Sequence, residues 1–251
     1  MSKTISPKTT TDAFLGGKVS LIQPSQGYRA GSDAVLLASA VRLKTPCAVL
    51  DVGCGVGTVG VCLASRFTDL TLTGIDVQPD LVALAQENYQ KNGITGEVIT
   101  GDILTSVPAL KGKQFSCVIT NPPFYDETPA RAHPGAAKAC QQTFALPQWL
   151  SFCLRHVAPK GTFYMIHRPE ALPDILAVLT PKLGDIQVIP ILTKAEKPAT
   201  RVIVGGTLGS HNPLVLHPPV ILHDATGERT RLAEAVMRHG QGLTDAYASI
   251  R

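Results

Sequence analysis

The 251-residue chain has little charge and no long apolar run. Only 17% of its residues are charged, a low share for a globular protein, whereas 44% are hydrophobic, which is ample for a core. No apolar run approaches the length of a membrane span. Residues 1–8 are polar and do not have the pattern of a signal peptide. We therefore expect a cytoplasmic protein with no membrane partner, and the length fits one large α/β domain.

The six cysteines contain no C-x-x-C pair, so the sequence shows no sign of a zinc site. Most of them stand in apolar surroundings, which is typical of reduced cysteines in a core. Lysines and arginines do not cluster either. The net charge of +4 is compatible with a polyanionic partner without establishing one. We expect no metal, and the chemistry has to come from other residues.

Asn121-Pro-Pro-Phe124 is the most informative stretch that the sequence does contain. It follows residues 116–120, which have the composition of a buried strand. The Asn121 side-chain oxygen and the Pro122 carbonyl can both accept hydrogen bonds from an NH2 group, and two prolines stiffen the turn. Phe124 offers a face on which a flat base can stack. The stretch can therefore hold a planar amine, although Asn-Pro is also common in ordinary turns.

A glycine-rich turn follows an earlier hydrophobic strand, predicted over residues 48–52. It reads Asp51-Val-Gly-Cys-Gly-Val-Gly57, and a helix is predicted from Thr58. Glycines let the backbone approach a ligand closely, and the N-terminus of the helix directs amides and a partial positive charge towards it. The alternative is a tight strand–helix connection that binds nothing.

Acidic residues stand at the ends of two further predicted strands. Asp76 ends the strand at 70–75 and suits a ribose diol, because a carboxylate accepts hydrogen bonds from both hydroxyls. Asp102 follows the strand at 96–100 and can accept from an adenine amine. Each residue alone is more often a helix cap or a solvated charge. Together with Asp51, however, they lie at three successive strand ends, where open parallel sheets bind their ligands.

In order and spacing, these motifs resemble those of the class I S-adenosylmethionine-dependent methyltransferases. The motifs are Asp51-Val-Gly-Cys-Gly-Val-Gly57, Gly74-Ile-Asp76, Gly101-Asp102 and Asn121-Pro-Pro-Phe124. The last one is similar to that of enzymes that methylate exocyclic amines of nucleic acid bases. The segments 27–38, 167–172 and 197–202 look like those of the bacterial tRNA1(Val) adenine-N6 methyltransferase family. The resemblance extends over roughly residues 12–240.

The resemblance implies a fold, a cofactor and a partner. The fold is Rossmann-like α/β, a mostly parallel seven-stranded sheet with helices on both faces and one antiparallel strand. The cofactor is S-adenosyl-L-methionine, and the partner is RNA, with adenine N6 of tRNA as the first choice. The expected catalytic residues are Asn121, Pro122, Pro123 and Phe124. The expected cofactor-binding residues are Tyr28, Arg29, Asp33, Asp51, Gly53, Gly55, Gly57, Asp76, Val77, Asp102, Ile103 and Asn121. The expected substrate-binding residues are Phe124, Tyr125 and Arg168.

Alternatives to this interpretation remain open. The same four-residue site serves guanine amines of ribosomal RNA and, with Tyr in place of Phe, glutamine amides of release factors. Gly55-Val-Gly57-Thr-Val-Gly60 also satisfies the G-x-G-x-x-G pattern of NAD-dependent oxidoreductases. Asp51 ahead of an extra Gly53 argues against that class, and the intact motif at 121–124 argues against a non-catalytic binding scaffold. Asp33 can equally be a helix cap.

We expect a single methyltransferase domain over residues 1–251. Residues 1–11 are expected to be flexible, 12–45 to form an N-terminal preamble, 46–207 the core sheet and 208–251 a C-terminal extension. The preamble contains a predicted hairpin around Gly16-Gly17 and a helix over 32–43. Later elements are helices at 146–156 and 169–183, strands at 161–167, 186–192 and 201–205, candidate strands at 214–217 and 220–223, and a short helix at 232–239. Trp149, the sole tryptophan, is expected in the core rather than against a base.

Overall fold

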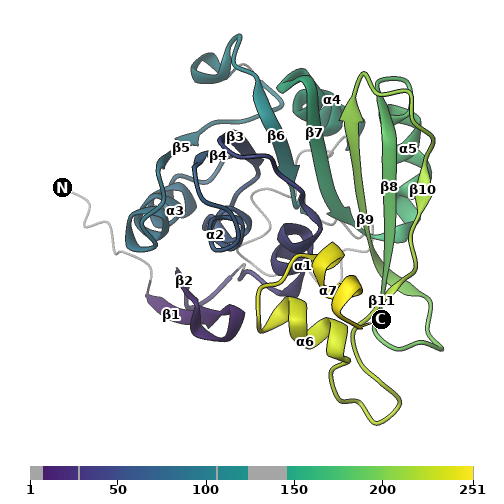
Figure 1. Cartoon of the computed structure of the whole chain (residues 1–251). Coiled ribbons are helices and arrows are strands. Elements are labelled where there is room, and N and C mark those ends of the chain that lie inside the picture. Colours follow the sequence, from purple (N-terminus) through teal and green to yellow (C-terminus); the bar gives the residue numbers. More distant parts are fainter. Residues whose placement is uncertain (1–7, 28, 106, 124–145, 251) are drawn as a thin grey trace.

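The computed structural model describes residues 8–27, 29–105, 107–123 and 146–250. Five parallel strands form its centre: β3 (Cys47–Val52), β4 (Leu70–Asp76), β5 (Gly96–Thr100), β6 (Phe115–Thr120) and β7 (Val157–His167). Their order in space is β7, β6, β3, β4 and β5 (Figure 1). β3, the first of these five strands in sequence, therefore lies in the middle, as in open doubly wound sheets.

Two more strands complete the predicted sheet, β8 (Leu183–Leu192) and β9 (Ala199–Leu208). β9 lies between β7 and β8 and is antiparallel to both, which confirms the one antiparallel strand of the predicted seven-stranded sheet. Two very short strands, β10 (Val215–Leu216) and β11 (Val220–Ile221), pair with β8 and bring the sheet to nine strands. They fall within the two candidate strands predicted in the C-terminal extension.

Helices cover both faces of the sheet. α1 (Ser32–Ala40), α2 (Thr58–Ala64) and α3 (Pro79–Lys91) pack on one face, and α4 (Leu146–Arg155) and α5 (Leu172–Leu179) pack on the other. Side chains alternate between the two: Val49 joins the cluster of α1 and α2, whereas Leu50 joins the cluster of α4 and α5. Because both faces are covered, the central strands have nearly continuous apolar sequences.

The N-terminal hairpin is confirmed around Gly16-Gly17. β1 (Thr9–Phe14) pairs with β2 (Val19–Pro24), and the 3₁₀ turn η1 (Leu15–Gly17) joins them. The expected flexible stretch over residues 1–11 is wrong for residues 9–11, which form part of β1. Their polar sequence, Thr-Thr-Thr, is unremarkable for an exposed strand, because threonine is β-branched and favours extended backbone.

The C-terminal extension packs against the preamble. α6 (Arg231–Met237) confirms the short helix predicted at 232–239, and α7 (Leu243–Ile250) was not predicted; both contact α1 (Figure 1). Other bounds differ by a few residues: α1 ends at Ala40, β7 begins at Val157, and the helix predicted at 169–183 is a 3₁₀ turn, η4 (Pro169–Ala171), followed by α5. One more 3₁₀ turn, η2 (Pro108–Leu110), precedes β6.

Five cysteines within these ranges are free and buried, in line with the expected core cysteines. In the same part of the chain, none of the helices combines the length and the apolar character that crossing a membrane requires.

Candidate active site

The predicted motifs come together at one edge of the sheet, where the parallel strands end. Asp51 is the second-last residue of β3, and Asp76 is the last residue of β4. Asn121 follows β6 directly, and β6 is paired with β3 so that Thr120 lies opposite Val52. The residues expected to hold a cofactor and those expected to hold an amine thus lie at the ends of adjacent strands.

The glycine loop between β3 and α2 needs glycine for two reasons. Gly53, Gly55 and Gly57 all have positive φ angles, of 71°, 56° and 82°. In addition, a Cβ atom on Gly53 would lie 2.8 Å from a ring carbon of Trp149, and one on Gly57 would lie 2.8 Å from the Tyr89 ring. The loop is therefore both left-handed and tightly enclosed, which other residues could not match.

Asp76 is tied to this loop. One carboxylate oxygen accepts a hydrogen bond of 2.9 Å from the Gly55 N–H, and the other accepts one of 2.9 Å from the Gln78 N–H. Burial raises the pKa of Asp76. The backbone N–H groups of Gln78, Gly55 and Val77 partly offset this rise. Each carboxylate oxygen still has a lone pair for a further donor, such as a ribose hydroxyl.

Three more of the expected cofactor-binding residues, Val77, Asp102 and Ile103, lie just after the ends of β4 and β5. Val77 is a large apolar side chain that is nevertheless 51% exposed, whereas Ile103 is buried. One carboxylate oxygen of Asp102 accepts from the Leu104 N–H at 2.9 Å, which closes a local turn. This local turn therefore occupies part of the hydrogen-bonding capacity of Asp102.

Asp51 is a buried carboxylate that, within the described part of the chain, lacks a hydrogen-bond partner at this edge of the sheet. Its side chain is 1% exposed, and neither carboxylate oxygen has a hydrogen-bond partner among the described residues. Burial raises its pKa to about 7; the Gly60 N–H, which points positive charge at the carboxylate without meeting hydrogen-bond geometry, partly offsets the rise, and the charge of Asp76 adds to it. Leaving a buried carboxylate unpaired is costly, so such a group is more typical of a binding site than of a structural core.

Asn121 shows the same lack of a partner. Its Oδ1 atom is buried and accepts no hydrogen bond within the described part of the chain. Pro122 is buried and Pro123 is exposed. Phe124, Tyr125 and Tyr28 lie outside the described residues. The available acceptor on Asn121 and the unpaired carboxylate on Asp51 suit a ligand that brings its own donors, and S-adenosylmethionine and an amine would do so.

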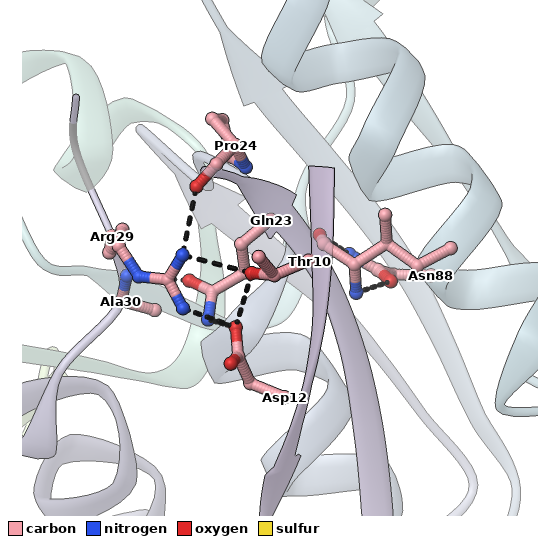
Figure 2. Close-up of polar contacts among 8 residues, drawn as sticks. Thr10, Asp12, Gln23, Pro24, Arg29, Ala30 and Asn88 are labelled. Carbon is pink, nitrogen blue, oxygen red and sulfur yellow. Dashed lines mark hydrogen bonds and ion pairs between the residues drawn. The ribbon is translucent and has the colours of Figure 1, made fainter. Parts of the chain in front are cut away.

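The described contacts of Arg29 are with the N-terminal hairpin. Its guanidinium forms an ion pair of 2.5 Å with Asp12 and donates to the Thr10 hydroxyl at 2.9 Å and the Pro24 carbonyl at 3.0 Å (Figure 2). Gln23, also buried in this network, accepts from the Ala30 N–H at 2.8 Å. Arg29 thus fixes the chain before α1, and direct cofactor binding by it stays a prediction.

Asp33 and Arg168 lie towards the β7–β9 side of the edge. Asp33 accepts from the Arg201 Nε at 2.8 Å, which ties the first turn of α1 to β9. Gly31 occupies the N-cap position of α1, so Asp33 is not the cap residue. Arg168 follows the end of β7 and is half-buried. Its neighbour His167 is 8% exposed, and burial lowers its pKa, to which the charge of Arg168 contributes.

Two residues that the sequence interpretation missed enclose the glycine loop. Trp149 packs against the core cluster of α4 and α5, as expected, and in addition donates from Nε1 to the Thr120 hydroxyl at 2.9 Å. Asn88 of α3 is fully buried and donates to the Val56 carbonyl at 2.9 Å. Its side chain also pairs with both backbone groups of Ile22 in the hairpin (Figure 2). An asparagine on the apolar face of α3 could have indicated Asn88 from the sequence, whereas nothing in the neighbouring sequence indicated the contacts of Trp149.

A cavity of about 580 Å³ lies away from this edge, against β7, β8 and β9. Tyr164, Gln187 and His217 are among the residues that line it, and none of the four sequence motifs contributes to it. We therefore do not regard it as the cofactor site.

Comparison with known sequences supports a methyltransferase. Residues 29–140 match the family model described as "Methyltransferase small domain". The tRNA1(Val) (adenine(37)-N6)-methyltransferase of Porphyromonas gingivalis is 27% identical over 246 residues, which cover 89% of this chain and 94% of that protein. The release factor glutamine methyltransferase of Escherichia coli is 38% identical over 34% of this chain and 30% of its own length. The ribosomal RNA small subunit methyltransferase C of Haemophilus ducreyi is 33% identical over 41% of this chain and 30% of its own length.

Solved structures agree on the fold. A crystal structure described as a predicted O-methyltransferase from Agrobacterium tumefaciens has a TM-score of 0.67 and 22% identity, and covers 84% of this chain and 97% of that one. One from Listeria monocytogenes, assigned to the class I S-adenosylmethionine-dependent methyltransferases, has a TM-score of 0.51 and 16% identity, over 76% of this chain and 62% of that one. None of these relatives is an oxidoreductase. Residues 29–140 match the methyltransferase small domain and the chain shares the fold of solved methyltransferases, so the protein is an S-adenosylmethionine-dependent methyltransferase with S-adenosyl-L-methionine as its cofactor.

Proposed function

We propose that the protein transfers the methyl group to the exocyclic amine of a nucleic acid base, adenine N6 in tRNA. The observation that carries the proposal is the buried Oδ1 atom of Asn121, which has no partner among the described residues and stands where β6 ends, beside the glycine loop. The matches support this choice, because the tRNA adenine-N6 relative aligns over nearly its full length, whereas the rRNA and release-factor relatives align over about a third of theirs.

The residues at the strand ends fit the parts of the cofactor. We propose that Asp51 and the loop with Gly53, Gly55 and Gly57 hold the methionine part, since Asp51 offers an unpaired carboxylate to an ammonium group. Asp76 would accept from the ribose hydroxyls, and Asp102 from the adenine amine. Val77 and Ile103 would cover the two faces of the adenine, which gives the exposed Val77 an apolar partner. Tyr28 and Asp33 stay proposals for the methionine end.

The amine-holding step follows from the acceptors on the chain. An aromatic amine is a poor nucleophile because its lone pair is delocalised into the ring. Hydrogen bonds from the amine to Asn121 Oδ1 and the Pro122 carbonyl favour a pyramidal nitrogen and stabilise the positive charge that develops on it. The bound cofactor supplies a methyl group on a positively charged sulfur. Positioning of the two partners for in-line displacement can be worth about 7–11 kcal/mol, and the methylated amine is acidic enough to lose its proton to water.

RNA fits this chemistry as the partner. A base has to leave its stack to reach a strand-end pocket, which costs a few kcal/mol and less in a single-stranded loop. We propose that Phe124 and Tyr125 clamp the base and that Arg168 contacts phosphate. A cytoplasmic location belongs to the same proposal, because tRNA is found there.

Mass spectrometry of nucleosides tests the proposal. Total RNA from cells with and without this gene would be digested and compared, and the loss of one N6-methyladenosine from one tRNA is the expected result. Loss of an N2-methylguanosine from ribosomal RNA, or of glutamine methylation in a release factor, would instead favour the respective alternative. Unchanged RNA and unchanged release factors would contradict the proposal.

A further inference from the structure

We propose that Trp149 is a positioning residue that holds the glycine loop and the amine-holding turn at a fixed separation. The inference rests on the proposed function in one respect, the identification of Asn121 as the residue that holds the amine. Trp149 is the sole tryptophan of the chain and comes from α4, on the opposite side of the sheet from α2.

The first link is a chain of hydrogen bonds through a buried hydroxyl. The indole Nε1–H of Trp149 donates to Thr120 Oγ1 at 2.9 Å, and the Thr120 hydroxyl donates to the Val52 carbonyl at 2.8 Å. Thr120 is fully buried and immediately precedes Asn121. Because its only proton goes to Val52, the hydroxyl has to accept from the indole, which fixes its rotamer. Trp149, β6 and β3 are thereby joined one residue from each functional turn.

The second link is direct contact with the loop. A Cβ atom on Gly53 would lie 2.8 and 2.9 Å from two carbons of the six-membered ring of Trp149. The ring therefore occupies the space beside the first glycine of the loop and blocks its movement towards α4. One side chain thus touches the cofactor loop with its ring and the amine-holding strand with its N–H.

Only a side chain with both features can set this separation. Methyl transfer needs the carbon and the nitrogen at about 3–3.5 Å, and a misplacement of about 1 Å can cost on the order of a hundredfold in rate. Among the described residues, Trp149 reaches the site through Gly53 and Thr120, so we assign it a positioning role. A buried indole N–H needs a partner in any core; here that partner is the residue that precedes Asn121, and the ring lies against the first glycine of the loop.

Fluorescence of the wild-type protein gives a first test, because all tryptophan emission comes from this residue. We expect that titration with S-adenosylhomocysteine changes the emission saturably, with the dissociation constant that calorimetry measures. Calorimetric binding without any change in emission would overturn the proposed contact between the ring and the cofactor loop.

Variants separate positioning from packing. Thr120→Val keeps the shape and removes the hydroxyl, Thr120→Ser keeps the hydroxyl, and Trp149→Phe removes the N–H. We expect Thr120→Val and Trp149→Phe to weaken S-adenosylhomocysteine binding about fivefold or more and to lower kcat on tRNA from cells lacking the gene by about tenfold or more, whereas Thr120→Ser stays within about threefold. Equal values for the Val and Ser variants would overturn the proposal.

Phe152→Leu is the matched control. Phe152 lies on the same helix and is 3% exposed in the core, away from the glycine loop. We expect it to lower the melting temperature without changing binding or kcat; if it changed them as much as Trp149→Phe does, the role of Trp149 would be packing alone. If the wild-type protein methylates no RNA, the proposed function fails, while calorimetry and fluorescence, which need no methyl acceptor, still decide on Trp149.

Discussion

Replacing Asp51 by Asn should stabilise the folded protein near pH 8 while weakening cofactor binding. Asp51 is 1% exposed and has no hydrogen-bond partner among the described residues for either oxygen. Burial raises its pKa from 3.8 to about 7, and Asp76 contributes in the same direction. Asn has nearly the same shape and no charge, so it removes the cost of an ionised, buried carboxylate.

The size and the sign of the effect follow from the pKa. Each pKa unit corresponds to about 1.4 kcal/mol, so the rise from 3.8 to about 7 corresponds to about 4 kcal/mol. Between these two values the folded state binds more protons than the unfolded state. The free energy of unfolding therefore falls as the pH rises from about 4 to about 7, and stays lowered above that. The stabilisation by Asp51→Asn should approach about 4 kcal/mol at pH 8, less the cost of burying the Asn amide, and vanish near pH 4.

Thermal unfolding at pH 5, 6, 7 and 8 measures the effect, and calorimetry with S-adenosylhomocysteine measures the loss of binding, which we expect to be about tenfold or more. Asp174→Asn is the control, because Asp174 lies exposed on α5 and should show neither effect. A variant that melts below the wild-type protein at pH 8 and still binds S-adenosylhomocysteine normally would refute the reasoning.

Three further substitutions probe the same edge. Asn121→Ala should abolish methyl transfer and leave S-adenosylhomocysteine affinity nearly unchanged, because it removes the proposed acceptor of the amine; equal activity in both proteins would end that role. Gly53→Ala should cost about 2 kcal/mol or more of unfolding free energy and weaken binding, since φ is 71° and the new Cβ would clash with Trp149. Gly93→Ala shares the positive φ but has open space, so it should lose stability without losing affinity. Asn88→Ala should weaken S-adenosylhomocysteine binding, whereas Asn92→Ala, which contacts the hairpin at Ser20 but not the loop, should only lower the melting temperature.

The parts of the site that sequence could predict are those with a local pattern. Gly53, Gly55 and Gly57 stand within one turn, and Asp76 ends a strand whose apolar sequence is visible by itself. The alternation of strands and helices then places these ends at one edge, because parallel strands need crossover connections. The seven strands and the one antiparallel strand followed from the same pattern and the resemblance.

What could not be predicted depends on contacts between distant segments. Trp149 meets Thr120 and Gly53 only because α4 packs over β6 and β3, and its own neighbours in sequence show an ordinary apolar helix. Residues 9–11 look like a frayed polar end, and only the pairing with β2 makes them a strand. Arg29 was assigned to the cofactor on the resemblance, yet its described partners belong to the hairpin.

The glycine loop is held from three directions, which bears on how the cofactor binds. Asp76 fixes the Gly55 N–H from β4, Asn88 fixes the Val56 carbonyl from α3, and the Trp149 ring lies against Gly53 from α4. A loop with positive φ at three positions would otherwise sample many conformations, and ordering it on binding would cost affinity. Because of these contacts the loop is already ordered in the folded protein, so its entropy is lost during folding and not on cofactor binding. Residues on three separate elements thus prepare the backbone for the cofactor, while Asp51 and Asn121 keep acceptors that the described chain does not satisfy and that the ligands can pair.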